Sequence, residues 1–157
     1  MEYILMNKNT KVLKAIMDNN NHFTKIIEIY NLDYAPISIV NANYDKSKSI
    51  VKSLDEWFRG RGIPTWRKDL EKLLKNLGVT SKEELLTISY GLSLSDCYWL
   101  KDESSNLLWE NINFFDNKFD YTGYLEATYS NNLSVKPNLM SPNNTTDGML
   151  SKAWIID

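Results

Sequence analysis

Alternating strand-like and turn-like segments near the N-terminus limit the fold of this 157-residue chain more than any other feature. Residues 3–6, 12–17 and 23–30 are apolar, β-branched or aromatic runs, and the polar segments 7–10 and 18–21 separate them. Strands joined by such short turns predict an antiparallel sheet. At least one face of that sheet must be covered by other elements.

Helices are expected to follow this sheet. Apolar residues recur at helical spacing from 47 or 49 to about 58, from 64 to 77, and from 80 or 81 to 90. Residues 80–84 have the pattern of a capping box, and Gly78 stands where the second helix ends. The sequence therefore predicts an α+β fold in which about three helices cover the open face of a small antiparallel sheet.

Other parts of the chain carry less regular signals. Residues 36–40 predict an edge strand, since a proline is tolerated only at the edge or at the start of a strand. After the helices, residues 97–100 predict a strand, and residues 107–109 are expected to pair back across a turn. Residues 109–116 mix aromatic and amide side chains, which is typical of a packed loop.

Two units are predicted along the chain. Residues 1–132 form one subdomain, with weak helix signals at its end, and residues 133–157 form a linker and a C-terminal hairpin packed on the same domain. Pro142 and the pair Asp147 and Gly148 supply the turn chemistry of that hairpin. Its loop of Asn, Thr and Gly can present N–H and hydroxyl groups to an anion such as phosphate.

Composition and residue pairs argue against several classes of function. The net charge of -2 does not favour direct nucleic-acid contact, and no apolar run is long enough to cross a bilayer. His22 is expected to be a solvent-facing spacer and Cys97 a buried, inert thiol, so neither a metal site nor a catalytic residue is assigned. The carboxylate pairs at 55–56 and 83–84 are expected on solvated helix faces. A single cysteine fits a reducing, cytoplasmic location.

The most distinctive polar pattern lies between the first two predicted helices. Arg59, Arg61 and Arg67 surround two glycines and can bind a phosphate or a carboxylate bidentately. Alternatively, they satisfy the carbonyl groups at the end of a helix and pair with acidic side chains, namely Asp69, Glu71 or Asp96. We favour the structural role, because the tight turn between helices already explains the glycines.

Four strings of residues, taken together, resemble a known family. They are WFRGRGIPTWR at 57–67, YGLSLSDCYW at 90–99, WENINFFDN at 109–117 and SPNNTTDGMLSKAW at 141–154. In this order they resemble segments of HipA-like serine/threonine kinases of Gram-positive bacteria. The resemblance implies that residues 1–132 are similar to the subdomain that precedes the kinase core, a small sheet with helices.

The same resemblance implies a role for the C-terminal stretch. Thr145, Gly148 and Lys152 match the start of the glycine-rich ATP hairpin, with threonine where the family has a regulatory, autophosphorylated serine. The family's catalytic and Mg²⁺-binding aspartates have no counterpart in this sequence. Because phosphoryl transfer needs those groups, we expect no catalysis from this chain alone, and ATP and Mg²⁺ as cofactors only if a kinase core completes it.

Three functions fit these expectations. The first is a non-catalytic interaction module that binds a protein partner, such as a kinase core or a toxin or antitoxin subunit; Arg59, Arg61, Trp66 and Arg67 are its candidate contact residues. The second is the N-terminal part of a full HipA-like kinase of a toxin–antitoxin system. The third is an inhibitor encoded by a mobile element that uses the same fold.

Overall fold

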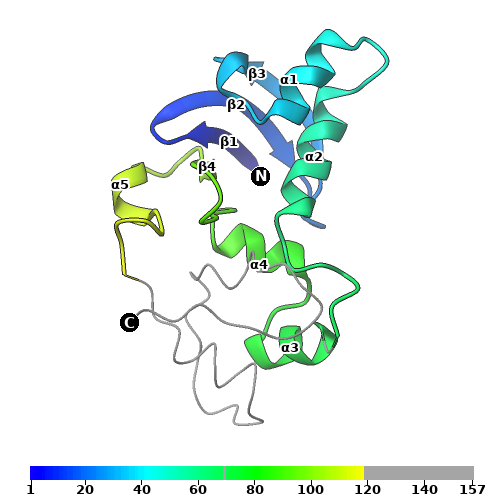
Figure 1. Ribbon diagram of the computed structural model, residues 1–157, viewed down its shortest axis with the longest axis vertical. Coiled ribbons are helices and arrows are strands. Elements are labelled where there is room, and N and C mark those ends of the chain that lie inside the picture. The colour runs from blue at the N-terminus through cyan, green and yellow to red at the C-terminus, as the bar shows by residue number, and fades with distance from the viewer. Residues whose placement is uncertain (69, 119–157) are drawn as a thin grey trace.

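Four antiparallel strands form the sheet in this computed structural model, which describes residues 1–68 and 70–118. The strands are β1 (Glu2–Asn7), β2 (Thr10–Met17), β3 (Phe23–Ile29) and β4 (Tyr98–Asp102). Their order is β3-β2-β1-β4, so the late strand β4 pairs with the first strand, as Figure 1 shows. The strands predicted at residues 3–6, 12–17, 23–30 and 97–100 and the α+β class are confirmed.

The central strand β1 is buried on both of its faces. Tyr3 and Leu5 belong to one hydrophobic cluster, and Ile4 and Met6 belong to another. This division follows from the alternation of side chains along a strand, which sends neighbouring residues to opposite faces of the sheet. The sheet is therefore a middle layer at this point and needs cover on two sides.

Six short helices accompany the sheet in the described residues. Their bounds are η1 (Leu32–Tyr34, a 3₁₀ turn), α1 (Ile37–Tyr44), α2 (Ile50–Gly60), α3 (Leu70–Leu77), α4 (Lys82–Ile88) and α5 (Trp109–Ile112).

The predicted capping box is present at the start of α4. Ser81 Oγ accepts a hydrogen bond from the Glu84 N–H at 3.0 Å, and the Glu84 carboxylate accepts the Thr80 N–H at 2.7 Å. Ser49 caps α2 in the same way, because its Oγ accepts the Lys52 N–H. These side chains satisfy donors that the first turn of a helix leaves unpaired.

The prediction of an edge strand at 36–40 is wrong. These residues begin α1, and Pro36 is its N-cap residue with a φ of -52°. A proline already has the backbone angle that a helix start requires, and its missing N–H is not needed there. Ile39 and Ala42 lie three residues apart on one side of the helix and are buried. The buried residues therefore recur at helical spacing, which the five residues 36–40 are too few to distinguish from strand spacing.

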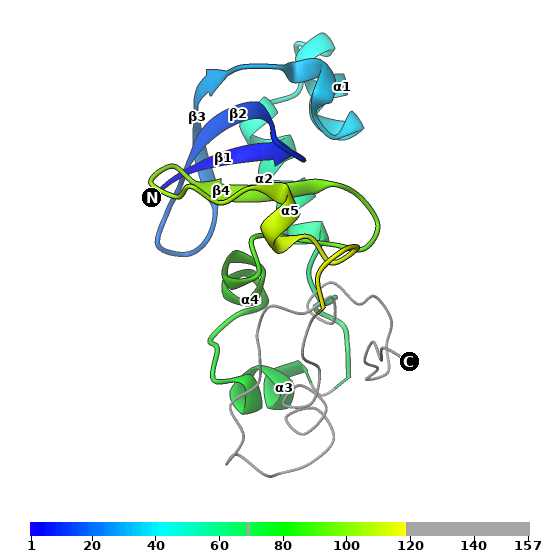
Figure 2. The ribbon, with the colours of Figure 1, turned by 90° about the vertical axis from the view of Figure 1, so that its left-hand side faces the viewer.

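Three helices cover one face of the sheet, as predicted, but α1 takes the place expected of α3. The first cluster joins Leu5 and Leu13 of the sheet to Ile39 of α1, Phe58 of α2 and Leu86 of α4. Helix α3 instead packs with α4 in a cluster of its own, away from the sheet (Figure 2). The helix predicted from residue 64 is shorter than expected, since residues 64–67 form a turn.

The aromatic region covers the opposite face of the sheet. Trp99, Trp109 and Phe114 pack there with Ile4 and Met6. The predicted strand pairing at 107–109 is wrong, and part of the expected loop at 109–116 is the short helix α5. Burying Trp109 and Ile112 against the second face of the sheet stabilises the chain more than pairing residues 107–109 as a strand would. The expectations for residues 119–157, including the hairpin, lie outside the described residues.

Candidate functional site

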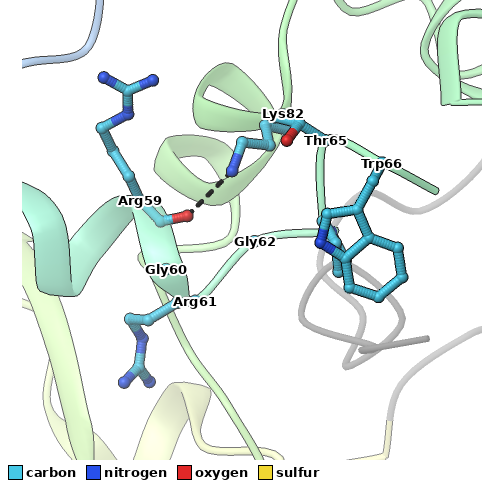
Figure 3. Close-up of a pocket in the computed structure, with 8 residues that line it drawn as sticks. Arg59, Gly60, Arg61, Gly62, Thr65, Trp66 and Lys82 are labelled. Carbon is cyan, nitrogen blue, oxygen red and sulfur yellow. Dashed lines mark hydrogen bonds between the residues drawn. The ribbon is translucent and has the colours of Figure 1, made fainter. Parts of the chain in front are cut away.

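A pocket of about 380 Å³ lies on the loop that follows α2. Its lining residues are Arg59, Gly60, Arg61, Gly62, Pro64, Thr65, Trp66 and Lys82. Figure 3 shows that the guanidinium groups of Arg59 and Arg61 point away from Trp66 and Lys82. The backbone of residues 59–62 and the side chains of Trp66 and Lys82 thus form much of the rim, although the sequence suggested a ring of arginines.

Arg61 is a structural link between α2 and β4. Its Nη atoms donate to the two carboxylate oxygens of Asp96 at 2.7 and 2.9 Å, and its Nε donates to the Gly91 carbonyl at 2.7 Å. The guanidinium also lies over the Trp57 ring, 4.6 Å from its centroid. With its side chain 7% exposed, every charge-bearing group of Arg61 is engaged inside the protein. The predicted pairing with Asp96 is confirmed.

Arg59 belongs to a second polar cluster. Its Nη1 lies 3.3 Å from both ring nitrogens of His22, and its Nε lies 3.3 Å from Glu83 Oε1. The Arg59 carbonyl accepts a hydrogen bond from Lys82 Nζ at 3.0 Å, drawn as a dashed line in Figure 3. These contacts tie the last turn of α2 to the first turn of α4.

The same cluster corrects two expectations from the sequence. His22 is more than a solvent-facing spacer, because its side chain is 39% exposed but its Nδ1 lies 3.1 Å from Asp55 Oδ2. Asp55 also accepts the Phe23 N–H at 2.8 Å, and its side chain is 18% exposed. Glu83, at 12%, is likewise not on a solvated helix face. Only the spacing of Asp55 and Arg59, four residues apart on one helix face, hinted at this cluster.

Residues 64–67 form a turn that places an aromatic side chain in solvent. The Arg67 N–H donates to the Pro64 carbonyl at 3.0 Å and closes the turn. Ile63, just before it, is fully buried in the cluster of α3 and α4. Trp66, within the turn, is 64% exposed. A buried anchor therefore holds an exposed tryptophan at the edge of the pocket.

Arg67 differs from the other cations of the loop. It is 3% exposed, and none of its three guanidinium nitrogens has a hydrogen-bond partner within the described residues. It lines a second pocket of about 590 Å³ together with Thr65, Leu70, Glu71 and Lys72. Thr65 lines both pockets, so the two are adjacent. The sequence did not distinguish Arg67 from its neighbours.

The other candidate residues are not brought to this site by the part of the structure that is described. Thr145, Gly148 and Lys152 lie outside it. Cys97 is partly exposed, contrary to the expectation of a buried thiol. No group of three or more possible metal ligands is found in residues 1–68 and 70–118. Across the same ranges, every helix is too short or too polar to cross a membrane.

Comparisons of the chain with protein-family models, with curated proteins and with solved structures found no match. The loop from Arg59 to Arg67 and the two pockets beside it are the candidate site of this chain.

Proposed function

We propose that this chain is a non-catalytic interaction module that binds a protein partner through the loop between α2 and α3. The observation that carries the proposal is Trp66, a large aromatic side chain held in solvent beside a pocket. Tryptophan is among the residues that most often dominate binding energy at protein interfaces, particularly where a partner encloses it.

The polar groups around the loop support binding by a preorganised surface. Arg61 is fixed by Asp96 and Trp57, and Arg59 contacts Glu83 and His22. A surface that is already ordered loses little conformational entropy when a partner docks. Both arginines already contact other side chains of the protein. Their main contribution is therefore to hold the backbone that carries Trp66.

The partner that the sequence resemblance suggests is a kinase polypeptide or another subunit of a toxin–antitoxin pair. A cytoplasmic location fits this proposal, because a single cysteine is typical of a reducing compartment. The proposal requires neither ATP nor a metal ion on this chain.

Affinity capture from the native host tests the proposal. Wild-type protein and the Trp66→Ala variant are used as baits in parallel, with Tyr44→Ala as the matched control. Tyr44 is an aromatic residue at the end of α1, 75% exposed, and α1 lies at the other end of α2 from the loop (Figure 1). We expect one protein to be retained by the wild type and by Tyr44→Ala, and to be lost with Trp66→Ala.

The affinity of that protein is then measured for each variant by calorimetry. If Trp66 is a hot spot, the Kd should rise by at least roughly tenfold in Trp66→Ala. Equal affinity of the wild type and Trp66→Ala would refute the assignment of this surface. Failure of the wild type to retain any protein would refute the binding function.

A further inference from the structure

We propose that Arg67 is the receiving group of an anion subsite that takes a carboxylate or phosphate group from a peptide segment of the protein partner. This inference rests on the proposed function and adds the chemistry of the partner to it. Its basis is the contrast between Arg67 and the other cations that surround the same loop.

Three other cations beside the loop, Arg59, Arg61 and Lys82, have acceptors or counter-charges. Arg61 is paired with Asp96, and both Arg59 and Lys82 lie within 4 Å of Glu83 Oε1, at 3.3 and 3.7 Å. Arg67 has no hydrogen-bond partner among the described residues, although it is the most deeply buried of the arginines.

An uncompensated buried guanidinium is an unusual feature. Arginine stays charged at all physiological pH values and carries five N–H donors, so it cannot lose its charge when it is buried. Removal of a charge from water without a partner is strongly unfavourable. A bound oxyanion would supply the missing charge and, in a bidentate geometry, two acceptors. The described part of the structure thus contains the cation of an ion pair without its anion.

The second pocket provides the place for the other half. It is lined by Arg67 and Lys72, by the Thr65 hydroxyl side chain, and by one acidic residue, Glu71. Two cations and one carboxylate suit a single anionic side chain. A nucleic-acid backbone would require a larger excess of positive charge. Since the guanidinium nitrogens are covered, we expect the Arg67 side chain to turn toward the pocket when the anion binds.

The location next to Trp66 gives the partner segment two points of contact. Trp66 stands at the rim of the first pocket, and Arg67, the next residue, lines the second. A peptide with an apolar residue near an acidic or phosphorylated residue would fit both. Trp66 would then supply most of the contact area, while Arg67 would select the charged residue.

The free protein gives the first test. Arg67→Met removes a buried charge and keeps a long apolar side chain, so we expect its Tm to rise by roughly 2–4 °C. Arg61→Met is the control for loss of a paired arginine, and its Tm should fall. A fall for Arg67→Met as well would show that Arg67 is paired inside the protein, for example with Asp69, and would overturn the proposal.

Peptide titration gives the second test. Three peptides, acetyl-Gly-Glu-Gly-amide, its phosphoserine analogue and its glutamine analogue, are added to the full chain, and the Arg67 Nε–Hε resonance is followed by NMR. We expect a saturable shift, with dissociation constants in the millimolar range, for the glutamate or the phosphoserine peptide. A larger response to one of the two identifies an acidic or a phosphorylated segment as the natural source.

Control variants keep this result interpretable. The peptide response measured at neighbouring amides should vanish in Arg67→Met and persist in Lys25→Met, which removes an exposed cation from β3. An equal response to the glutamine peptide, or an unchanged response in Arg67→Met, would overturn the subsite. If Trp66→Ala loses the captured partner while Arg67→Met retains full affinity, the proposed function stands and the subsite alone fails.

Discussion

The two ends of the loop between α2 and α3 hold arginines in opposite situations. Arg61, at the sheet end, makes a bidentate ion pair with Asp96, donates to the Gly91 carbonyl and stacks on Trp57. Arg67, at the α3 end, is more deeply buried and has no hydrogen-bond partner in the described residues. The same residue type therefore stabilises the fold at one end, while at the other end its charge has no partner in residues 1–68 and 70–118.

This contrast separates a structural part of the loop from a binding part. The sheet end is fixed by contacts between segments far apart in the sequence, and its charges cancel within the protein. The α3 end carries an exposed tryptophan and a buried guanidinium that has no partner among the described residues, and external groups can contact both. Substitutions at the sheet end should therefore reduce stability, and substitutions of Trp66 and Arg67 should mainly change binding.

Arg61→Met is expected to have the largest effect on stability. It removes the Arg61 donors of the Gly91 carbonyl and of the Asp96 carboxylate, although the Tyr98 N–H still donates to Asp96 Oδ1, which predicts a loss of roughly 2–4 kcal/mol in the free energy of unfolding. The lower part of that range allows for Asp96, whose side chain remains 29% exposed. Urea denaturation measures the change.

A double-mutant cycle checks the cause. Arg61→Met combined with Asp96→Asn should cost less than the sum of the two single changes, because each single change leaves an unpaired partner. Strict additivity would mean that the pair contributes little, and the distinction between the two ends of the loop would be lost.

Gly91→Ala is expected to cause the next largest loss of stability. Gly91 lies three residues after α4 and has a φ of +61°, and its carbonyl accepts the hydrogen bond from Arg61. A side chain in this left-handed conformation costs about 1–2 kcal/mol. The added Cβ meets Phe58 at an ordinary contact distance of 3.5 Å, so the cost comes from the backbone. The midpoint of chemical denaturation should fall accordingly.

Gly60→Ala is the matched control for this change. Gly60 is the last residue of α2, its φ is not positive, and an added Cβ there meets no atom within 4 Å. Stability should be unchanged or rise by up to ~1 kcal/mol. Equal losses for the two alanine variants would contradict a conformational origin of the effect at Gly91.

Ser81→Ala tests whether the two ends of the loop unfold together. The substitution removes the cap of α4 and should cost about 1 kcal/mol. Leu85 of α4 packs with α3, while Leu86 packs against the sheet, so α4 touches both parts of the fold. Native-state hydrogen exchange should therefore show a similar loss of protection in α3 and in the sheet.

Ser38→Ala, on the exposed side of α1, is the control for loss of a hydroxyl group and should change stability by less than about 0.5 kcal/mol. If Ser81→Ala reduced protection from hydrogen exchange in α3 alone, α3 would unfold independently of the sheet.

The smallest expected effect is a pH dependence at Glu84. Hydrogen bonds from the Thr80 hydroxyl and from the Thr80 backbone N–H hold the pKa of Glu84 below its ordinary value. Because the folded-state pKa is depressed, this stabilisation is present above the unfolded pKa and is lost as pH falls through the folded pKa. The stability difference between wild type and Glu84→Gln should therefore shrink on going from about pH 6 to about pH 3.

Glu56→Gln controls for the loss of one negative charge, since Glu56 lies on the exposed side of α2. A difference between wild type and Glu84→Gln that stayed constant with pH would refute a carboxylate cap at Thr80.

Much of the fold could be predicted because its signals are local. The first three strands, the caps at Ser49 and Ser81, and the helix end at Gly78 each depend on a few neighbouring residues. The edge strand expected at residues 36–40 failed for a related reason. Five residues do not separate a strand period from a helix period, and the surface that buries Ile39 decided the outcome.

The sequence located the candidate site but did not show which of its residues contact one another. The string of residues 57–67 marked the loop, and Asp96 was among the partners expected for its arginines. The cluster of His22, Asp55, Arg59 and Glu83 was not predicted, because these residues come from three separate elements. No local pattern relates His22 to Asp55, 33 positions away, or Arg59 to Glu83, 24 positions away.

The sequence by itself determined the strands, the helix caps and a loop rich in arginine, since short-range backbone and side-chain preferences control these features. Only the tertiary structure decided which arginine finds a counter-charge. Packing of α2 against the sheet brings Arg61 to Asp96 across 35 positions in the sequence, whereas Arg67, six residues further along, is carried toward α3 and meets no acceptor among the described residues. Charge compensation in a folded chain depends on which surfaces meet, and pairwise spacing along the sequence does not contain that information.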